Sequence, residues 1–356
     1  MTRDPATGRP SGNRLARTLA RYPELGLIVA IVAVVALIYG VEPTHAFFNP
    51  YSQRTMFHNI ALFGVLSVGA AVVIIAGGID LSVGSVVALS AVVCAKLMTE
   101  WLPGARAASG PLPIGLVTAA VALTLVMGLA IGLLHAFMIN NLRLPPFIAT
   151  LATMAGLRSL ATILSNNRTI NVPSPTFRVL GKLGGLNFRL PGPYLDWIPI
   201  DSVPVWIFAG VALTLSVVMG STVLGRHLYA LGGNETAARL SGLSTRRLKA
   251  IAYALAGMLA ALGGVLFAGN TGQADGRMGN TYELLAITAA VVGGCSLAGG
   301  VGSIRGTVLG LILIQIVIKG TGLVVPGIDP SQIEGLVLGT VVVIAVAFNQ
   351  RLRGRG

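Results

Sequence analysis

The segment AGGIDLSVGS, residues 76–85, places a lone acid where the surrounding chain reads as membrane-spanning helix. Backbone released from a helix at membrane depth is tolerated only against protein or a water-filled cavity, and a carboxylate there costs roughly 3 kcal/mol unless it is paired or hydrated. Asp80 and the neighbouring Ser82 are therefore candidates for the path of a polar solute. The alternative is that Asp80 caps the next helix by accepting hydrogen bonds from amides near Ser82 and Val83.

A second break in the apolar pattern covers residues 140–159, where two consecutive prolines stiffen the entry to a new helix. Thr150 and Thr153 lie just beyond them. These threonines either line the same polar path or bond back to carbonyls of their own helix. Asn59, in the apolar stretch 57–78, completes the set of candidate path residues.

Motifs for enzymatic chemistry are missing from the sequence. The four histidines share no HExxH spacing, there is no GxSxG, and the glycine-rich stretch 291–310 lacks the GxxxxGK[ST] spacing that cradles nucleotide phosphates. Small residues in that stretch instead predict a close helix crossing. Cys94 and Cys295 lie in apolar segments without CxxC spacing, which favours core packing. We expect no catalysis, no metal and no cofactor bound by this chain.

The composition indicates that these residues lie in a membrane. The chain has 54% hydrophobic and 10% charged residues and a mean hydropathy of +0.81. Apolar stretches about 20 residues long fill nearly all of it, which predicts an all-α, polytopic membrane protein with one transmembrane domain over residues 25–350. The ten candidate helices cover 25–41, 57–78, 82–98, 113–138, 147–164, 204–222, 250–268, 283–298, 304–324 and 333–348.

The net charge of +13 sits in short runs beside the spans and is not interleaved with exposed aromatics, a pattern typical of membrane topology and not of nucleic-acid binding. With an even number of spans, the basic segment 1–24 and the basic tail 351–356 face the same side, which we expect to be the cytoplasm. The loop 223–249 falls on that side and the stretch 166–203 on the other. We interpret the run 25–41 as an uncleaved first span, although its flanks resemble a secretory signal.

The cytoplasmic loop 223–249 is unlike a simple connection between spans. Glu235, Arg239 and Gly242 follow one another at spacings of four and three, which predicts one face of a short helix, and the small Ala238 permits close approach. Such a segment on the wet side of a bilayer is suited to docking against another protein. The alternative is a solvated loop that carries only topology charges.

Four motifs in order resemble one known family. They are GGIDLSVGSVVALSA, LRLPPFIATLATMAGLRSLA, GRHLYALGGNETAARLSGLSTRRLK and AVVGGCSLAGGVGSIRGTVLG. In this order and spacing, the chain from about Leu25 to Phe348 resembles the membrane permease subunit of bacterial ABC-type sugar importers, the ribose and galactofuranose group. The resemblance implies a type II ABC importer-like permease of ten helices in the inner membrane.

The same resemblance implies partners. The subunit would pair with a second copy or a paralogue, be driven by cytoplasmic ATPase subunits that hold ATP and Mg²⁺, and receive a sugar from a periplasmic binding protein. In this chain Glu235, Ala238, Arg239 and Gly242 match the family's ATPase-coupling segment. Asp80 and Ser82 match the GGIDLS signature beside the translocation path. The identity of the sugar stays open, because the binding protein selects it.

An ion-coupled secondary transporter is the alternative function. It too would be a helical bundle with broken helices at a midplane site, but it would need acids or histidines placed to titrate inside the membrane. Only Asp80, Glu283 and Glu334 lie near spans, and the last two are expected at span ends. An intramembrane enzyme would need a paired nucleophile and base, which the sequence does not offer.

Overall fold

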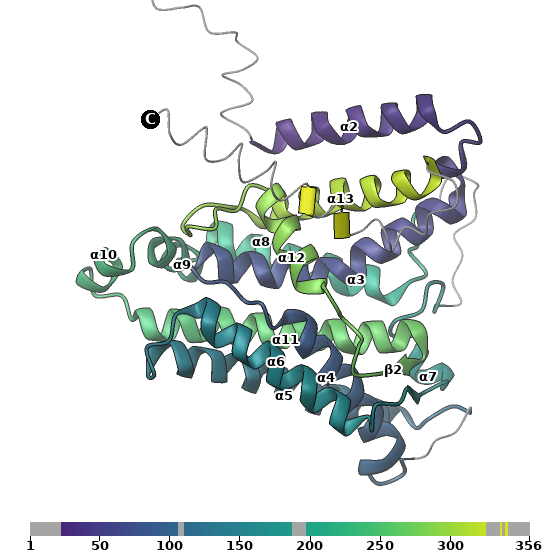
Figure 1. Ribbon diagram of the computed structural model, residues 1–356, viewed down its shortest axis with the longest axis horizontal. Coiled ribbons are helices and arrows are strands. Elements are labelled where there is room, and N and C mark those ends of the chain that lie inside the picture. Colours follow the sequence, from purple (N-terminus) through teal and green to yellow (C-terminus); the bar gives the residue numbers. More distant parts are fainter. Residues whose placement is uncertain (1–22, 106–109, 187–196, 325–334, 337–338, 341–356) are drawn as a thin grey trace, which may run out of the picture.

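Figure 1 shows the computed structural model of the chain, in which long helices lie side by side. The structure describes residues 23–105, 110–186 and 197–324, and two helical pairs at 335–336 and 339–340. Eight helices in this described part are long and apolar enough to cross a membrane, which confirms the all-α, polytopic class. They are α2 (Pro23–Val41), α3 (Pro50–Ile75), α4 (Val83–Lys96) with its π-helical extension η2 (Leu97–Trp101), α5 (Ile114–Asn140), α6 (Pro146–Leu164), α8 (Val203–Ser221), α11 (Thr245–Thr271) and α13 (Ile304–Val324).

The eighth predicted span, 283–298, is shorter than expected. Helix α12 covers Tyr282–Val292, and 11 residues give a helix of only about 16 Å, roughly half the hydrocarbon thickness of a bilayer. The tenth predicted span, 333–348, lies almost entirely outside the described residues, as do the basic segments at both ends of the chain. The remaining elements are short: η1 (Ala46–Phe48), β1 (Ile170–Asn171), α7 (Pro175–Arg178), α9 (Val223–Gly233), α10 (Glu235–Leu240) and β2 (Gln273–Ala274).

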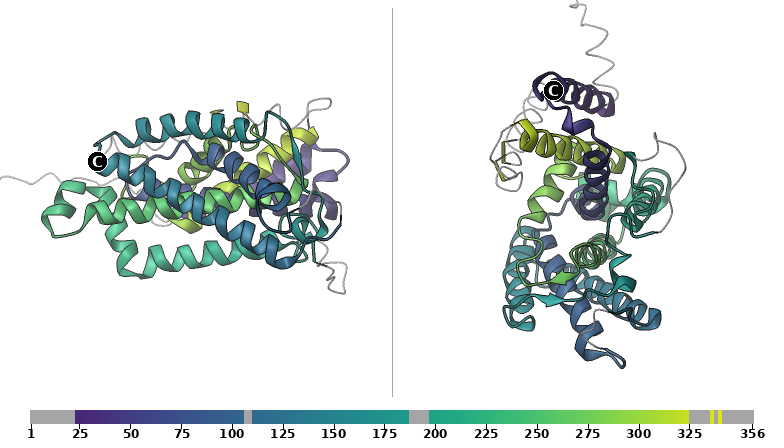
Figure 2. Two further views of the ribbon diagram at one scale, coloured as in Figure 1. Left: turned by 90° about the horizontal axis from the view of Figure 1, so that it is seen from below. Right: turned by 90° about the vertical axis from the view of Figure 1, so that its right-hand side faces the viewer.

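Helix α11 is the centre of the bundle. It packs most extensively against α5 and then against α4 and α3. The α5–α11 crossing brings backbone against backbone, because a Cβ added at Gly132 would lie 2.1 Å from the Tyr253 carbonyl oxygen and one at Gly257 would lie 2.3 Å from that of Gly128. Close approach through small residues is the usual way in which helices associate in lipid. Figure 2 shows this packed region seen across and along the helices.

The outer helices are mostly exposed. Within α2, α6 and α8 fewer than a fifth of the residues in the membrane-length window are buried, whereas most of α3 and α4 is buried. Their exposed side chains are large and apolar; Val32 and Leu37 of α2 are 62% and 64% exposed. An apolar surface of this kind fits contact with lipid or with a second membrane subunit. In Figure 1, α2 lies apart at the edge of the bundle, next to α13.

The bundle has two distinct ends. At the α7 end, β1 pairs antiparallel with β2 in the register Ile170 to Ala274, and Arg54 forms an ion pair with Asp201 at 2.6 Å. At the α10 end, α9 and α10 project beyond the long helices (Figure 1). The predicted outer stretch 166–203 therefore contains a short strand and a short helix in its described part.

Candidate functional site

The first helix break begins where α3 ends. Gly77 adopts φ +82°, a left-handed conformation that glycine accepts without strain. The amide of Gly77 donates to the carbonyl of Ile74, and the amide of Gly78 donates to that of Val73, which is the Schellman pattern of helix termination. The paired glycines thus stop α3 at Ile75 and turn the chain back into the bundle.

Asp80 is 3% exposed and organises the start of α4. Its Oδ1 accepts hydrogen bonds from the Ser82 amide at 2.8 Å and from the Ser82 hydroxyl at 2.6 Å. The predicted hydrogen bond from a backbone amide near Ser82 to Asp80 is therefore present. The capping hypothesis needs one correction, because Ser82 and not Asp80 is the N-cap residue, and its carbonyl accepts the first helical bond, from Val86. Asp80 holds the N-cap in place from two residues upstream.

Three other helices surround this break with polar groups. Thr150 of α6 and Tyr253 of α11 both donate to the Ile79 carbonyl, at 3.3 and 3.4 Å. His135 of α5 is fully buried, and its Nε2 lies 2.8 Å from the Thr153 hydroxyl. Both threonines bond back to carbonyls of α6, as one of the two alternatives drawn from the sequence states, and their place on a substrate path stays a prediction. The first break is a meeting point of four helices.

A second break lies between α11 and α12. Gly272 ends α11 with φ +70°, and after the short strand β2 the chain runs back into the bundle in turns until Tyr282. Arg158, from the middle of α6, donates to the carbonyls of Gly276, Met278 and Gly279. One guanidinium therefore satisfies three carbonyls that have left a helix, which is how irregular backbone is tolerated at this depth.

The two breaks meet at the starts of α4 and α12. A Cβ added at Gly84 would lie 2.1 Å from the Gly279 carbonyl oxygen and 2.2 Å from Oε2 of Glu283. Oε2 of Glu283 is buried without a hydrogen-bond partner among the described residues. Glu283 lies in the first turn of α12, at a helix end as expected, but this end lies inside the bundle, beside the start of α4 that Asp80 organises.

Asn59 does not belong to this cluster. It lies on α3 sixteen residues before Ile75, which corresponds to about 24 Å along the helix, and it is partly buried toward the α7 end. Sequence reasoning did not assign His135 or Arg158 to the site, although Arg158 lies in the second family motif, and it named Glu283 only as an acid at a span end. A basic residue within an otherwise apolar span, as at Arg158, was the one local signal that could have been followed.

The glycine-rich stretch 291–310 closes the α10 end of the bundle. Gly293 and Gly306 bring α12 and α13 into backbone contact, as the small residues there predicted. The amide of Gly300 donates to the carbonyl of Ile75 at 2.9 Å, and Gly299 packs on Gly77. Beside this junction is a cavity of about 290 Å³ that reaches Gly78 and Tyr253. The cavity connects the α10 end with the neighbourhood of the first break.

The predicted coupling loop, 223–249, is mostly helical. It contains α9 and α10, and its last five residues form the first turns of α11. The Thr222 hydroxyl accepts from the Gly225 amide, and Asn234 Oδ1 accepts from the Ala237 amide, so each short helix has a side-chain N-cap. These caps explain why a polar, glycine-containing segment forms a rigid projection.

Three of the predicted docking residues have roles within the subunit itself. Ala238 is buried, 5% exposed, because it faces the bundle. Glu235 pairs with Lys249 of α11 at 2.8 Å and with Arg239 at 3.5 Å, so it ties α10 to the bundle. Gly242 lies beyond the end of α10 with φ +84° and forms the turn into α11. The predicted single face through Glu235, Arg239 and Gly242 is therefore wrong beyond Arg239.

The polar groups of this site hold the ends of broken helices in place. They are either paired with backbone or buried between helices, and no group of three or more potential metal ligands occurs in the described part of the chain. Two interrupted helices with their N-termini directed into the bundle resemble the architecture of membrane transport sites.

Comparison with known proteins also indicates a membrane transport protein. Residues 54–346 match the family described as branched-chain amino acid transport system / permease component. The chain is 33% identical to the ribose import permease protein RbsC of Escherichia coli (strain K12), over 91% of this chain and 92% of that protein. It is 33% identical to the ribose import permease protein RbsC of Bacillus subtilis (strain 168), over 92% of each. It is 32% identical to the galactose/methyl galactoside import permease protein MglC of Haemophilus influenzae, over 90% and 91%. No solved structure was found to match.

Proposed function

Because this chain belongs to the family of transport-system permease components, we propose that it is the membrane-spanning subunit of an ATP-driven, binding-protein-dependent sugar importer. The observation that carries this proposal is similarity to ribose and galactose import permeases over about nine-tenths of both chains. The bundle itself is a multi-pass membrane protein with broken helices. A monosaccharide is the substrate class that the named relatives favour.

The proposed partners follow from what the chain lacks. Its sequence holds no nucleotide-binding motif, so the free energy for uptake would come from a cytoplasmic ATPase that binds ATP and Mg²⁺. A periplasmic binding protein would select the sugar. A second permease copy or a paralogue would cover part of the apolar surface of the outer helices, and lipid the rest.

The α10 end is the proposed ATPase-docking side. Leu240, the last residue of α10, is 85% exposed and is the most exposed of the large apolar side chains in the described part. An apolar side chain at the tip of a rigid, capped projection is a suitable anchor for a partner groove. Arg239 beside it is 66% exposed at its side chain. We therefore place the docking contact at Leu240 and Arg239, with Glu235 and Ala238 holding α10 in position.

This assignment also sets the proposed orientation. The α10 end carries Arg226, Arg239, Arg246 and Arg247 and would face the cytoplasm, as the positive-inside rule prefers. The α7 end would face the periplasm and receive the binding protein. Both chain termini would then lie in the cytoplasm if the segment after α13 crosses once more.

Reconstitution tests the proposal. The chain is placed in vesicles with the ATPase and binding protein encoded beside it, and uptake of labelled ribose, galactose and leucine is measured with and without internal ATP. We expect uptake of a sugar that requires both ATP and the binding protein. Uptake of leucine alone would instead indicate a branched-chain amino acid as the substrate, in line with the family's description.

A second function needs its own experiment, because Asp80 and His135 are buried in the bundle and Glu283 lies against Gly84 at the start of α4. An ion-coupled transporter would use such groups. Uptake by the chain alone, driven by an imposed proton or sodium gradient without ATP, would contradict the ATP-driven proposal. Collapse of the gradient without loss of ATP-dependent uptake would support it.

A further inference from the structure

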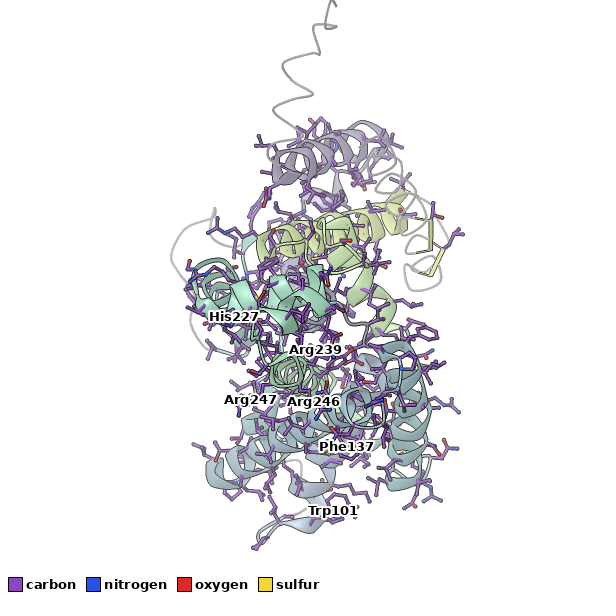
Figure 3. All side chains as sticks on the ribbon, turned by 90° about the vertical axis from the view of Figure 1, so that its left-hand side faces the viewer. Trp101, Phe137, His227, Arg239, Arg246 and Arg247 are labelled. Carbon is purple, nitrogen blue, oxygen red and sulfur yellow. The ribbon has the colours of Figure 1, made fainter. Side chains whose placement is uncertain are left out.

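A pocket at the α10 end is strongly basic. Its volume is about 790 Å³, in the range of pockets that hold small ligands. Five cationic side chains line it, and Glu235 is its only acid. Figure 3 looks onto this end of the molecule and shows Arg239, Arg246 and Arg247 gathered around the start of α11. The cationic lining residues are Arg143, Arg239, Arg246, Arg247 and Lys249.

These charges are unfavourable without an anion. Arg246 and Arg247 lie in the first turn of α11, where the helix dipole is positive and an acid would be preferred. Glu235 is already paired with Lys249 and Arg239, so it leaves Arg143, Arg246 and Arg247 uncompensated. All three are exposed. The excess of positive charge in one concave site is complementary to a bound anion.

The position of the pocket selects the kind of anion. Its walls are the last residues of α5 and the first residues of α11, tied by a hydrogen bond from Asn140 Nδ2 to the Arg246 carbonyl at 3.0 Å. These are the ends of two 27-residue helices of about 40 Å, so the pocket lies at the level of lipid headgroups. Phe137 and Leu142 beside it are 51% and 57% exposed and apolar.

We propose that this basic pocket binds the phosphate headgroup of an anionic phospholipid, with the acyl chains along the exposed apolar surface of α5. Arginines at the end of a span, next to apolar surface, are the arrangement that recognises such headgroups. An acidic partner protein is less well matched, because α10 lies in front of the pocket and presents Leu240 to anything that approaches from the aqueous side. The inference concerns this chain alone and does not depend on the proposed importer function.

Lipid binding by the purified full-length chain tests the proposal. Dioleoyl phosphatidylglycerol and dioleoyl phosphatidylcholine, which have the same acyl chains, are titrated in mixed micelles and retained lipid is counted by native mass spectrometry. We expect phosphatidylglycerol to bind at least about tenfold more tightly, with affinity that falls as salt is raised. Replacing both Arg246 and Arg247 with Gln should lower that affinity on the order of 30-fold, since two cations near a headgroup are removed.

Two variants keep the test specific. Arg226→Gln removes an exposed cation from α9 at the same end that does not line the pocket, and it should leave the affinity unchanged. Arg143 lies in a turn, and Arg143→Gln should weaken lipid binding about fivefold even if the double variant is unstable. Equal binding of the two lipids, or an equal loss in Arg226→Gln, would overturn the proposal. Displacement of the lipid by millimolar inorganic phosphate would also overturn the proposal and would assign the site to a free anion. Unchanged lipid binding in the Arg246 and Arg247 double variant, together with weakened copurification of the ATPase, would overturn it too and would assign the site to an acidic protein.

Discussion

Asp80 shows how one acid can be both buried and satisfied in a membrane chain. Its carboxylate accepts from the amide and hydroxyl of Ser82, and the Ser82 carbonyl in turn receives the first helical bond of α4. In the structure, Asp80 therefore stabilises the start of α4 inside the bundle. A contact between Asp80 and substrate remains a separate hypothesis, which a conservative substitution can separate from the structural role.

Asp80→Asn should keep Oδ1 as an acceptor, and the subunit should therefore assemble with nearly unchanged stability. Asp80→Leu leaves two buried donors of Ser82 unpaired, which should lower the free energy of unfolding by about 2 to 5 kcal/mol. Denaturation in detergent measures the stability, and uptake measures the function. If the Asn variant assembles fully but does not transport, the charge serves the path; a Leu variant as stable as wild type would contradict the structural role.

Arg158 offers a second prediction at this scale. Arg158→Met should remove the donors to the carbonyls of Gly276, Met278 and Gly279, lower stability by roughly 2 to 3 kcal/mol and reduce uptake. Arg158→Lys should give a smaller loss, because one ammonium cannot reach the three carbonyls with the geometry of a guanidinium. The matched control is Arg168→Met at an exposed position. Equal stability of the two Met variants, measured by denaturation, would show that Arg158 does not hold the second break.

At the scale of elements, the projection formed by α9 and α10 differs from the amphipathic face predicted from sequence. Helical spacing correctly related Glu235 and Arg239, which lie one turn apart and contact each other. It could not show that the short helix ends at Leu240 or that Ala238 faces the bundle. Those features depend on the ion pair to Lys249 and on the left-handed turn at Gly242. A bulky residue at Gly242 would therefore strain the backbone and would not test docking cleanly.

Leu240→Gln is the cleaner test of docking. Because Leu240 is 85% exposed, the substitution should change stability by less than about 0.5 kcal/mol, yet it should weaken ATPase copurification and ATP-dependent uptake at least about tenfold. Val223→Gln, at a 56% exposed position on α9, serves as the control. Normal uptake by the Leu240 variant would place the docking contact elsewhere.

At the scale of the whole molecule, the two ends of the bundle must face opposite sides of the membrane. Ser244 is exposed at the α10 end and Thr169 is exposed at the α7 end. Ser174, also at the α7 end, is unsuitable for labelling because it is buried and accepts a bond from the Leu112 amide. The native Cys94 and Cys295 are both buried, so an introduced cysteine would be the accessible one in the described part.

Single cysteines at these positions test the orientation. In intact cells an impermeant thiol reagent should label Thr169→Cys and should label Ser244→Cys only after the membrane is permeabilised. The expectation follows from the basic residues of the α10 end, which favour the cytoplasm. Labelling of Ser244→Cys from outside would invert the proposed topology.

The sequence by itself determined the membrane class, the positions of most spans and the places where helices break. These properties are local: hydropathy over about 20 residues decides partition into lipid, and Gly77 and Gly78 end α3 through hydrogen bonds to carbonyls of its own last turn. Only the tertiary structure decided that Asp80 and Glu283, 203 positions apart, share one site, and that Arg158 secures the second break. The reason is physical. Which side chains face one another depends on the packing of α6, α11 and α12 around α4, and that packing is set by backbone contacts that no single stretch of sequence contains.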